Sequence, residues 1–228
     1  LKKLNVKKIK NICNLKFSEI SNKKNIKLPS SFLKSIKKRL ILCASSTHPS
    51  EEKIIANIHS QLKKNINNLL TIIIPRHVQR ITKINEEIKS LGLRTIIRST
   101  NEKIKKETDI YLVDTYGETK KFFNISKVAF IGGSIVNHGG QNPIEPARFN
   151  LNIIHGPNID NFKDIYRLFD KKKAAFKINN ISELKKISFK LLKGKKRKKI
   201  NLSDMGNSIL KKSEAEILKI FKDEIKKT

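Results

Sequence analysis

The chain has 228 residues, of which 38% are hydrophobic, so it can bury a core and form one domain with appendages. Its 50 Lys and Arg against 20 Asp and Glu give a formal net charge of +30, which on its own favours nucleic acid, an anionic membrane or a polyanionic substrate as partner. Only 6% of residues are aromatic and tryptophan is absent, so no aromatic-interleaved basic strand offers a stacking platform, and a nucleic-acid partner is not expected.

From Arg39 onward, short apolar runs rich in β-branched residues alternate with longer charged segments of helical period. The predicted strands are Leu40–Ala44, Leu69–Ile74, Arg94–Ile97, Ile110–Val113, Val128–Ile131, Asn152–His155 and Ala174–Lys177. The predicted helices are Glu51–Lys64, Val78–Leu91, Glu118–Ser126, Ile144–Phe149, Phe162–Lys171 and Ser182–Leu192. This alternation predicts an α/β fold, a doubly wound parallel sheet of Rossmann-like type over residues 39–200.

The two ends of the chain follow other patterns. Residues 1–38 do not continue the alternation and are predicted to be a connector from a preceding domain. Residues 201–228 are predicted to form an amphipathic helix whose apolar side needs a surface to cover. The sequence begins at Leu1 rather than at a methionine, so we expect it to be a fragment of a longer protein.

Cysteine usage and hydropathy bear on the compartment. Cys13 and Cys43 are too few and too differently placed for a disulfide framework or a metal site, so a reducing compartment is expected, with Cys43 in the core. There is no signal peptide and no apolar stretch of about 18 residues, so these residues are not expected to cross a bilayer. The lysine excess is spread over the whole length, as on solvated helix faces, yet such a surface would also attract anionic lipid.

Polar loops follow four of the predicted strands, at the edge where doubly wound sheets bind their ligands. They are Ser45–His48, Pro75–His77, Asp114–Glu118 and the glycine-rich segment after Ile131. Ligand-binding side chains are therefore expected in all four loops.

The glycine-rich segment carries the strongest signal. Gly132-Gly133-Ser134 follows the strand, and Gly139-Gly140-Gln141-Asn142-Pro143-Ile144-Glu145-Pro146 leads into a helix. Glycines let a backbone approach a ligand closely, and a helix N-terminus favours a phosphate. Glu145, one turn into the helix, can accept hydrogen bonds from sugar hydroxyls, so the segment predicts a nucleotide-sugar site. The alternative is a tight strand-to-helix turn that binds nothing.

The other candidates each have a structural alternative. Arg76 with His77 can hold a phosphate or carboxylate, or Arg76 can be a salt-bridged residue at the rim. His48 can contact a ligand or be merely exposed, and Asp114 can act as a base or cap the next helix. His59 is predicted to be a helix-face residue. No histidine pair has metal-ligand spacing and no nucleophilic triad is legible, so neither metal nor covalent catalysis is expected.

At these residues the sequence resembles the 3-deoxy-D-manno-octulosonic acid (Kdo) transferase family, which moves Kdo from CMP-Kdo to a lipid A precursor in lipopolysaccharide synthesis. The blocks that carry the resemblance are Asn14–Phe17, Ala44–Pro49 with Glu51-Glu52, Pro75–His77, Asp114–Glu118, Gly132–Ser134, Gly139-Gly140, Asn142–Pro146, and Gly156-Pro157 with Asn161-Phe162. The chain departs from the family pattern at Ser50, Gln141 and Asn158, where the family has Gly, His and His.

The resemblance implies the C-terminal, donor-binding half of a GT-B glycosyltransferase. In the family, the N-terminal half carries a membrane-anchoring segment, the lipid acceptor surface and a catalytic carboxylate base. We therefore expect no catalytic residue in this chain, a metal-independent reaction, and a position at the cytoplasmic face of the bacterial inner membrane.

The resemblance also implies a set of donor-binding residues. Arg76 and His77 are expected to help hold CMP-Kdo, and the glycine loop and Asn142 are expected to face its phosphate. Glu145 is expected to bind the ribose, and Lys16 is expected to reach the cleft between the two domains of the GT-B fold. The full set is Lys16, Thr47, His48, Arg76, His77, Gly132, Gly133, Ser134, Gly140, Asn142 and Glu145. Two alternatives remain open: another GT-B transferase or epimerase that uses a UDP-sugar, and, less favoured, a basic nucleic-acid-binding protein.

Overall fold

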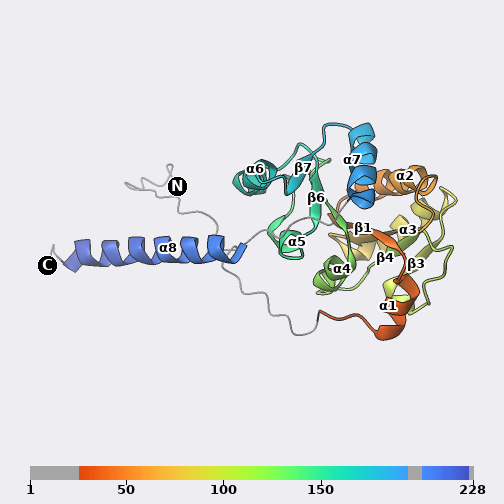
Figure 1. The fold of residues 1–228 in the computed structure, drawn as a ribbon, viewed down its shortest axis with the longest axis horizontal. Helices are drawn as coiled ribbons and strands as arrows, with labels where there is room; N and C mark the ends of the chain where they lie inside the picture. The colour runs from red at the N-terminus through yellow and green to blue at the C-terminus, as the bar shows by residue number, and fades with distance from the viewer. Residues whose placement is uncertain (1–25, 195–201, 226–228) are drawn as a thin grey trace. The chain divides into compact units, whose positions relative to one another are not determined.

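The computed structural model describes residues 26–194 and 202–225, and its centre is a parallel sheet of seven strands (Figure 1). The strands are β1 (Leu40–Thr47), β2 (Leu69–Pro75), β3 (Thr95–Ile97), β4 (Ile110–Leu112), β5 (Val128–Ile131), β6 (Asn152–His155) and β7 (Ala175–Lys177). They lie in the order β3-β4-β2-β1-β5-β6-β7. All seven predicted strands are confirmed, and β1 continues past its predicted end at Ala44 to Thr47.

Helices cover both faces of this sheet (Figure 1). They are α1 (Ser30–Ile36), α2 (Glu51–Lys63), α3 (Ile81–Lys89), α4 (Thr119–Ile125), α5 (Ile144–Arg148), α6 (Lys163–Lys171) and α7 (Ile181–Lys193). One core joins α2, α3 and α7 to the sheet. Because both faces are covered, the strands are apolar along their whole length rather than alternating.

Strand β1 illustrates this double burial. Leu42 and Ala44 belong to the core under α2, α3 and α7, whereas Cys43 points the opposite way and is also fully buried. Burial raises the pKa of the Cys43 thiol to about 12, so the group is un-ionised at neutral pH and behaves as a small hydrophobe. The core position predicted for Cys43 is confirmed.

Helix α1 was not expected, because residues 1–38 were predicted to be a connector. It packs on the sheet through Phe32, whose ring lies edge-on to those of Tyr111 (5.2 Å between centroids) and Phe122 (6.2 Å). The compact unit accordingly extends over Lys24–Lys199 and not only from residue 39. The helix is short, seven residues with Phe32 and Ile36 one turn apart, so its periodic signal was too brief to reveal it.

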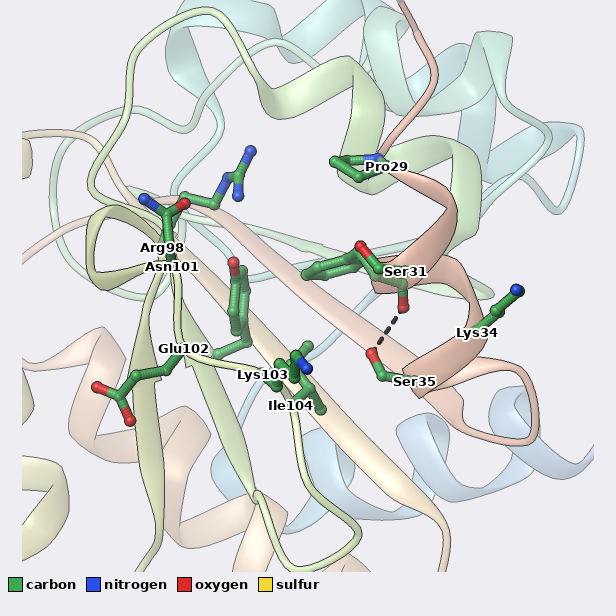
Figure 2. Close-up of a pocket in the computed structure, with 11 residues that line it drawn as sticks. Pro29, Ser31, Lys34, Ser35, Arg98, Asn101, Glu102, Lys103 and Ile104 are labelled. Carbon is green, nitrogen blue, oxygen red and sulfur yellow. Dashed lines mark hydrogen bonds between the residues drawn. The ribbon is translucent and has the colours of Figure 1, made fainter.

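A cavity of about 400 Å³ lies between α1 and the segment that follows β3 (Figure 2). Phe32, Tyr111 and Ile104 supply apolar lining, and Lys34 and Lys103 supply charge. The cavity lies at the end of the sheet formed by β3 and β4, whereas the site described below lies at β1 and β5.

The chain ends in α8 (Leu202–Ile225), close to the predicted helix, and this helix belongs to a second unit. Leu210, Ile217, Leu218 and Ile220 on it are exposed. Within the described residues, no helix is both long enough and apolar enough to span a membrane.

Candidate functional site

The site lies where the strand order reverses direction. From β1 the chain first builds the β2 side of the sheet, and it then returns to place β5 on the other side of β1. Ligands of doubly wound sheets bind at this switch point, outside the carboxyl ends of the strands, here called the carboxyl edge. The loops after β1, β2 and β5 meet there, because the Arg76 N–H donates to the Thr47 carbonyl (2.9 Å) and the Gly132 N–H to that of Ser45 (2.9 Å).

The glycine loop, residues 132–140, needs its glycines for internal reasons. A Cβ at Gly132 would collide with the Ser46 carbonyl oxygen, so this glycine lets β5 end directly against the end of β1. Gly133 and Gly140 have φ of +66° and +71°, and the Gly140 N–H donates to the Gly133 carbonyl at 2.8 Å. Such φ values favour glycine because it has no Cβ. The glycines therefore shape the loop.

The first backbone N–H groups of this loop after Gly132 are not free to bind phosphate. The Glu51 carboxylate accepts hydrogen bonds from the N–H groups of Gly133 (2.8 Å), Ser134 (3.2 Å) and Ile135 (3.0 Å). It also accepts one from the N–H of His48 (3.0 Å). The physical reason given for placing phosphate on Gly133 and Ser134 thus does not hold in this structure, although contact of the loop with a donor stays a prediction.

Two hydroxyl groups predicted to bind the donor are committed to internal contacts instead. Thr47 is fully buried and donates to Glu52 Oε1 at 2.9 Å. Ser134 is fully buried, donates to the Ile131 carbonyl (2.5 Å) and accepts from the Gly156 N–H (2.9 Å). Neither hydroxyl reaches solvent, so both are structural groups of the carboxyl edge.

Three histidines form a cluster in front of the loop, here called the histidine cluster. The rings of His48 and His138 stack with centroids 4.1 Å apart, and the His77 ring lies edge-on to His48 at 6.1 Å. Gln141 Nε2 lies 3.4 Å from His48 Nε2. Gln141, one of the three residues that depart from the family pattern, is therefore part of the site. His48 and His77 were predicted site residues, and the structure brings them together.

The histidine cluster lies in a positive environment. The pKa of His48 is lowered to about 4, first by burial and then by the charges of His138, His77, Arg80 and Arg76. Arg80 is neutralised by Glu52 through two hydrogen bonds of 3.0 Å each. Arg76 and His77 are exposed. An anion placed here would therefore interact favourably with Arg76 and with a protonated His48.

The loop continues into α5, which is short. Pro143 is the N-cap residue, and the Ile144 N–H, the first of the helix, donates to Asn142 Oδ1 at 3.0 Å, so the Asn142 side chain is engaged in the turn that enters the helix. The Glu145 side chain is 36% exposed and lies 3.6 Å from Lys120 Nζ. Its exposure leaves Glu145 accessible to a ligand at this edge.

The two carboxylates of the loop after β4 are engaged to different degrees. Glu118 accepts hydrogen bonds from Arg98, Lys121 and Thr115, which lower its pKa to about 2. Asp114 accepts the Ser99 N–H at 3.0 Å. Lys16 lies outside the described residues, and among those described no group of three or more His, Cys, Asp or Glu is arranged to hold a metal ion.

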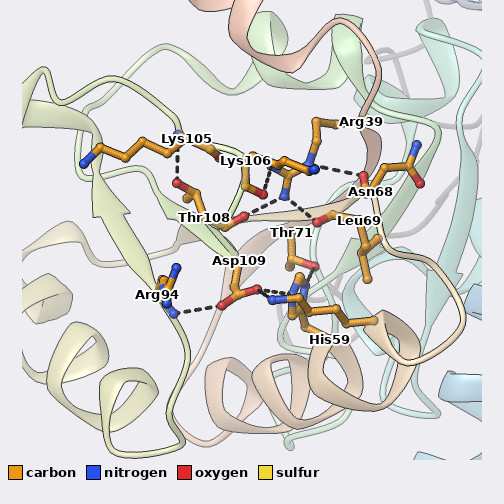
Figure 3. Close-up of polar contacts among 11 residues, drawn as sticks. Arg39, His59, Asn68, Leu69, Thr71, Arg94, Lys105, Lys106, Thr108 and Asp109 are labelled. Carbon is orange, nitrogen blue, oxygen red and sulfur yellow. Dashed lines mark hydrogen bonds and ion pairs between the residues drawn. The ribbon is translucent and has the colours of Figure 1, made fainter.

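A second polar cluster lies at the opposite edge, where the strands begin, here called the amino edge (Figure 3). Asp109 accepts hydrogen bonds from Lys63 and from the Arg94 N–H (2.9 Å), and it lies 3.4 Å from His59 Nε2. His59 Nδ1 is 2.8 Å from Thr71 Oγ1. His59 lies on α2, as predicted, and its side chain is on the buried face of that helix.

Arg39 completes the amino edge (Figure 3). Its guanidinium donates to five backbone carbonyls, with the shortest contacts of 2.6 Å to Leu69 and Thr108. The pKa of Asp109 is lowered although burial acts to raise it, because the hydrogen bonds from His59, Arg94 and Lys63 favour the ionised form. The charged groups of this cluster bind one another and the surrounding backbone, so the cluster has a structural role.

No family model matches the chain. It is similar to the 3-deoxy-D-manno-octulosonic acid transferase of Haemophilus influenzae, at 34% identity over 172 residues, 75% of this chain and 40% of the relative. It is also similar to that of Rickettsia bellii, at 34% identity over 185 residues, 79% of this chain and 43% of the relative. The chain thus spans less than half the length of these curated relatives.

Among solved structures, the chain is similar to the C-terminal CMP-Kdo binding domain of WaaA from Acinetobacter baumannii. The TM-score is 0.66 and the identity 27%, and the match covers 77% of this chain and 90% of that chain. The match therefore covers nearly the whole of a C-terminal domain that was solved as a separate chain.

Proposed function

We propose that the chain belongs to the 3-deoxy-D-manno-octulosonic acid transferase family and that its α/β unit binds CMP-Kdo at the carboxyl edge of the sheet. The observation that carries the proposal is the cluster of His48, His77 and His138 with the cationic Arg76 at the switch point. The similarity to a CMP-Kdo binding domain supports the choice of ligand.

The chemistry of the donor fits this cluster. CMP-Kdo carries a phosphate and a sugar carboxylate, so it presents two anionic groups to one site. Transfer breaks the bond between the phosphate oxygen and the anomeric carbon, and negative charge then develops on the departing CMP. Arg76 and the histidine cluster stabilise that charge by electrostatic interaction and hydrogen bonds. Glu145 accepts hydrogen bonds from the ribose hydroxyls.

Acceptor activation requires residues beyond the donor site. Three of the described carboxylates near the site are occupied: Glu51 by backbone amides, Glu52 by Arg80, and Glu118 by Arg98. We propose that the base and the lipid A precursor are supplied by a second domain, since the curated relatives are more than twice the length of the matched region. Holding the acceptor oxygen at attack distance is worth several kcal/mol, on the order of 7–11, which a donor domain cannot supply alone.

Calorimetry tests the donor assignment. The 228-residue chain is titrated with CMP and with UMP, which differ only in the base. We expect CMP to bind more tightly, and Glu145→Ala to weaken CMP by about 1–3 kcal/mol through unpaired hydrogen-bonding groups. Equal or tighter binding of UMP would instead favour an enzyme that uses a UDP-sugar.

The net charge of +30 supports a further part of the proposal, peripheral attachment to the anionic inner-membrane surface at its cytoplasmic face. Vesicle co-sedimentation is expected to require anionic lipid and to vanish near 1 M salt, where the Debye length is about 3 Å. Binding to neutral vesicles at that salt concentration would contradict it.

A further inference from the structure

The Glu51 carboxylate occupies a place where a phosphate was expected. Both of its oxygens face backbone N–H groups: Oε2 accepts from His48 and Gly133, and Oε1 accepts from Ser134 and Ile135. The side chain is fully buried. Backbone N–H groups of successive residues that converge on one point form an anion-binding nest, and here the anion belongs to the protein.

This arrangement joins two loops that are distant in sequence. Glu51 is the first residue of α2, and Gly133 lies 82 positions later. One carboxylate therefore fixes both the backbone at His48 and the start of the glycine loop. The His48 ring in turn packs against Gly133, since a Cβ there would lie 3.2 Å from His48 Cδ2.

We propose that Glu51 is a positioning residue for donor binding, an inference that rests on the proposed function. Its carboxylate fills the amide nest permanently and holds His48 and the glycine loop in place. The anionic groups of the donor are consequently bound by side chains in front of the nest, His48, His138 and Arg76, and not by the loop amides. A donor phosphate that used the same N–H groups would have to displace a buried carboxylate.

The geometry makes Glu51→Gln the sharpest variant. Each oxygen of Glu51 accepts from two N–H groups, so the NH₂ of a glutamine faces two donors in either orientation of its amide. The two groups lose their acceptor, and leaving buried groups unpaired is costly. Asp109→Asn is the matched control, because it also alters a buried carboxylate, but at the amino edge, with no contact to the loops after β1 or β5.

Three measurements on the 228-residue chain form the test: thermal unfolding, hydrogen exchange of the loop amides, and calorimetric titration with CMP. Glu51→Gln is expected to lose exchange protection at Gly133, Ser134 and Ile135 and to bind CMP at least about tenfold more weakly, the effect of one such unpaired group. Asp109→Asn is expected to lower the unfolding temperature while leaving loop protection and CMP affinity unchanged.

NMR of the unmutated chain decides the matter even where Glu51→Gln does not fold. With CMP bound, the N–H groups of Gly133, Ser134 and Ile135 are expected to show no coupling to the phosphorus nucleus, because they still donate to Glu51. A through-hydrogen-bond coupling from these amides to phosphorus would overturn the inference, as would CMP affinity within twofold of the unmutated chain in folded Glu51→Gln. Failure of the unmutated chain to bind CMP would instead refute the proposed function, and the placement of the donor with it.

Discussion

At the amino edge, Asp109 accepts hydrogen bonds from Lys63 and the Arg94 N–H and lies beside His59, while Arg39 binds carbonyl groups around it. At the carboxyl edge, the buried carboxylate of Glu51 binds only backbone N–H groups. Of the charged side chains nearby, Arg80 pairs with the buried Glu52, whereas Arg76 is exposed. The amino edge therefore uses its charged side chains to stabilise the fold. The carboxyl edge uses a carboxylate to fix two loops, and its exposed positive group, Arg76, stays available for a ligand.

The largest expected effect breaks the amino edge. Asp109→Ala removes the acceptor of His59, Lys63 and the Arg94 N–H, and losing one member of a buried charged cluster costs about 3 kcal/mol. Chemical denaturation should show this loss in the free energy of unfolding. CMP affinity of the folded fraction is expected to stay within twofold, and a larger loss would show that the two edges are not independent.

The reciprocal variant is Arg76→Ala at the carboxyl edge. Arg76 is exposed, so the free energy of unfolding is expected to change by less than about 0.5 kcal/mol. CMP affinity is expected to fall by about 1.5–3 kcal/mol, the contribution of a hydrogen bond to a charged group. Lys83→Ala, another exposed cation outside the site, serves as control. If both variants bind CMP equally well, Arg76 is a rim residue without a ligand role.

Proton titration sharpens the comparison. The pKa of His48 is about 4 in the fold against an ordinary value of 6.5, so the unfolded chain binds more protons between these values. The stability contributed by neutral His48 is therefore complete above pH 6.5 and is lost as pH falls toward 4. The pKa of His59 is also lowered, chiefly by burial, and adds a loss in the same direction.

CMP should affect the two histidines differently, which NMR titration of the ring protons can measure. An anion in front of the histidine cluster raises the pKa of His48 above its value of about 4 in the free chain, so CMP binding is coupled to proton uptake by His48 as pH falls toward that value. The pKa of His59, at the other edge, is expected to stay unchanged. Equal shifts of both histidines, or of neither, would contradict the assigned site.

The smallest expected effect is a gain in stability. Ser50, where the family has glycine, adopts φ of +76° immediately before Glu51, and a non-glycine residue there carries strain. Ser50→Gly is expected to raise the free energy of unfolding by about 0.5–1 kcal/mol, with CMP affinity preserved. Thermal unfolding measures the gain, and a loss would mean that the Ser50 side chain contributes an interaction that offsets its strain.

Periodicity predicted the seven strands and six of the helices because burial on both faces leaves continuous apolar runs in sequence. The loops that meet at the carboxyl edge were also predicted, since each follows a strand. The partners of individual polar groups could not be. Thr47 and Ser134 are residue types that often contact ligands, yet their acceptors, Glu52 and the Ile131 carbonyl, lie only five and three positions away, and the geometry of the turns between them decides that these bonds form.

Glu51 is another residue whose hydrogen-bond partners could not be predicted from the sequence. Two consecutive glutamates after His48 were visible as a motif, but the amides that Glu51 binds lie more than 80 positions away. Helical period placed His59 on a helix, but it does not reveal that Thr71 and Asp109 face it. Tertiary contacts over long sequence separations decide such roles.

The central claim, that the carboxyl edge binds the donor nucleotide, is tested most directly by amide NMR spectra of the 228-residue chain during CMP titration. Saturable shifts are expected at His48, at Arg76 and His77, and through the glycine loop, with the amides of Leu69, Thr71 and Asp109 unchanged. Shifts concentrated at the amino edge, or no saturable shift at any amide, would contradict the account.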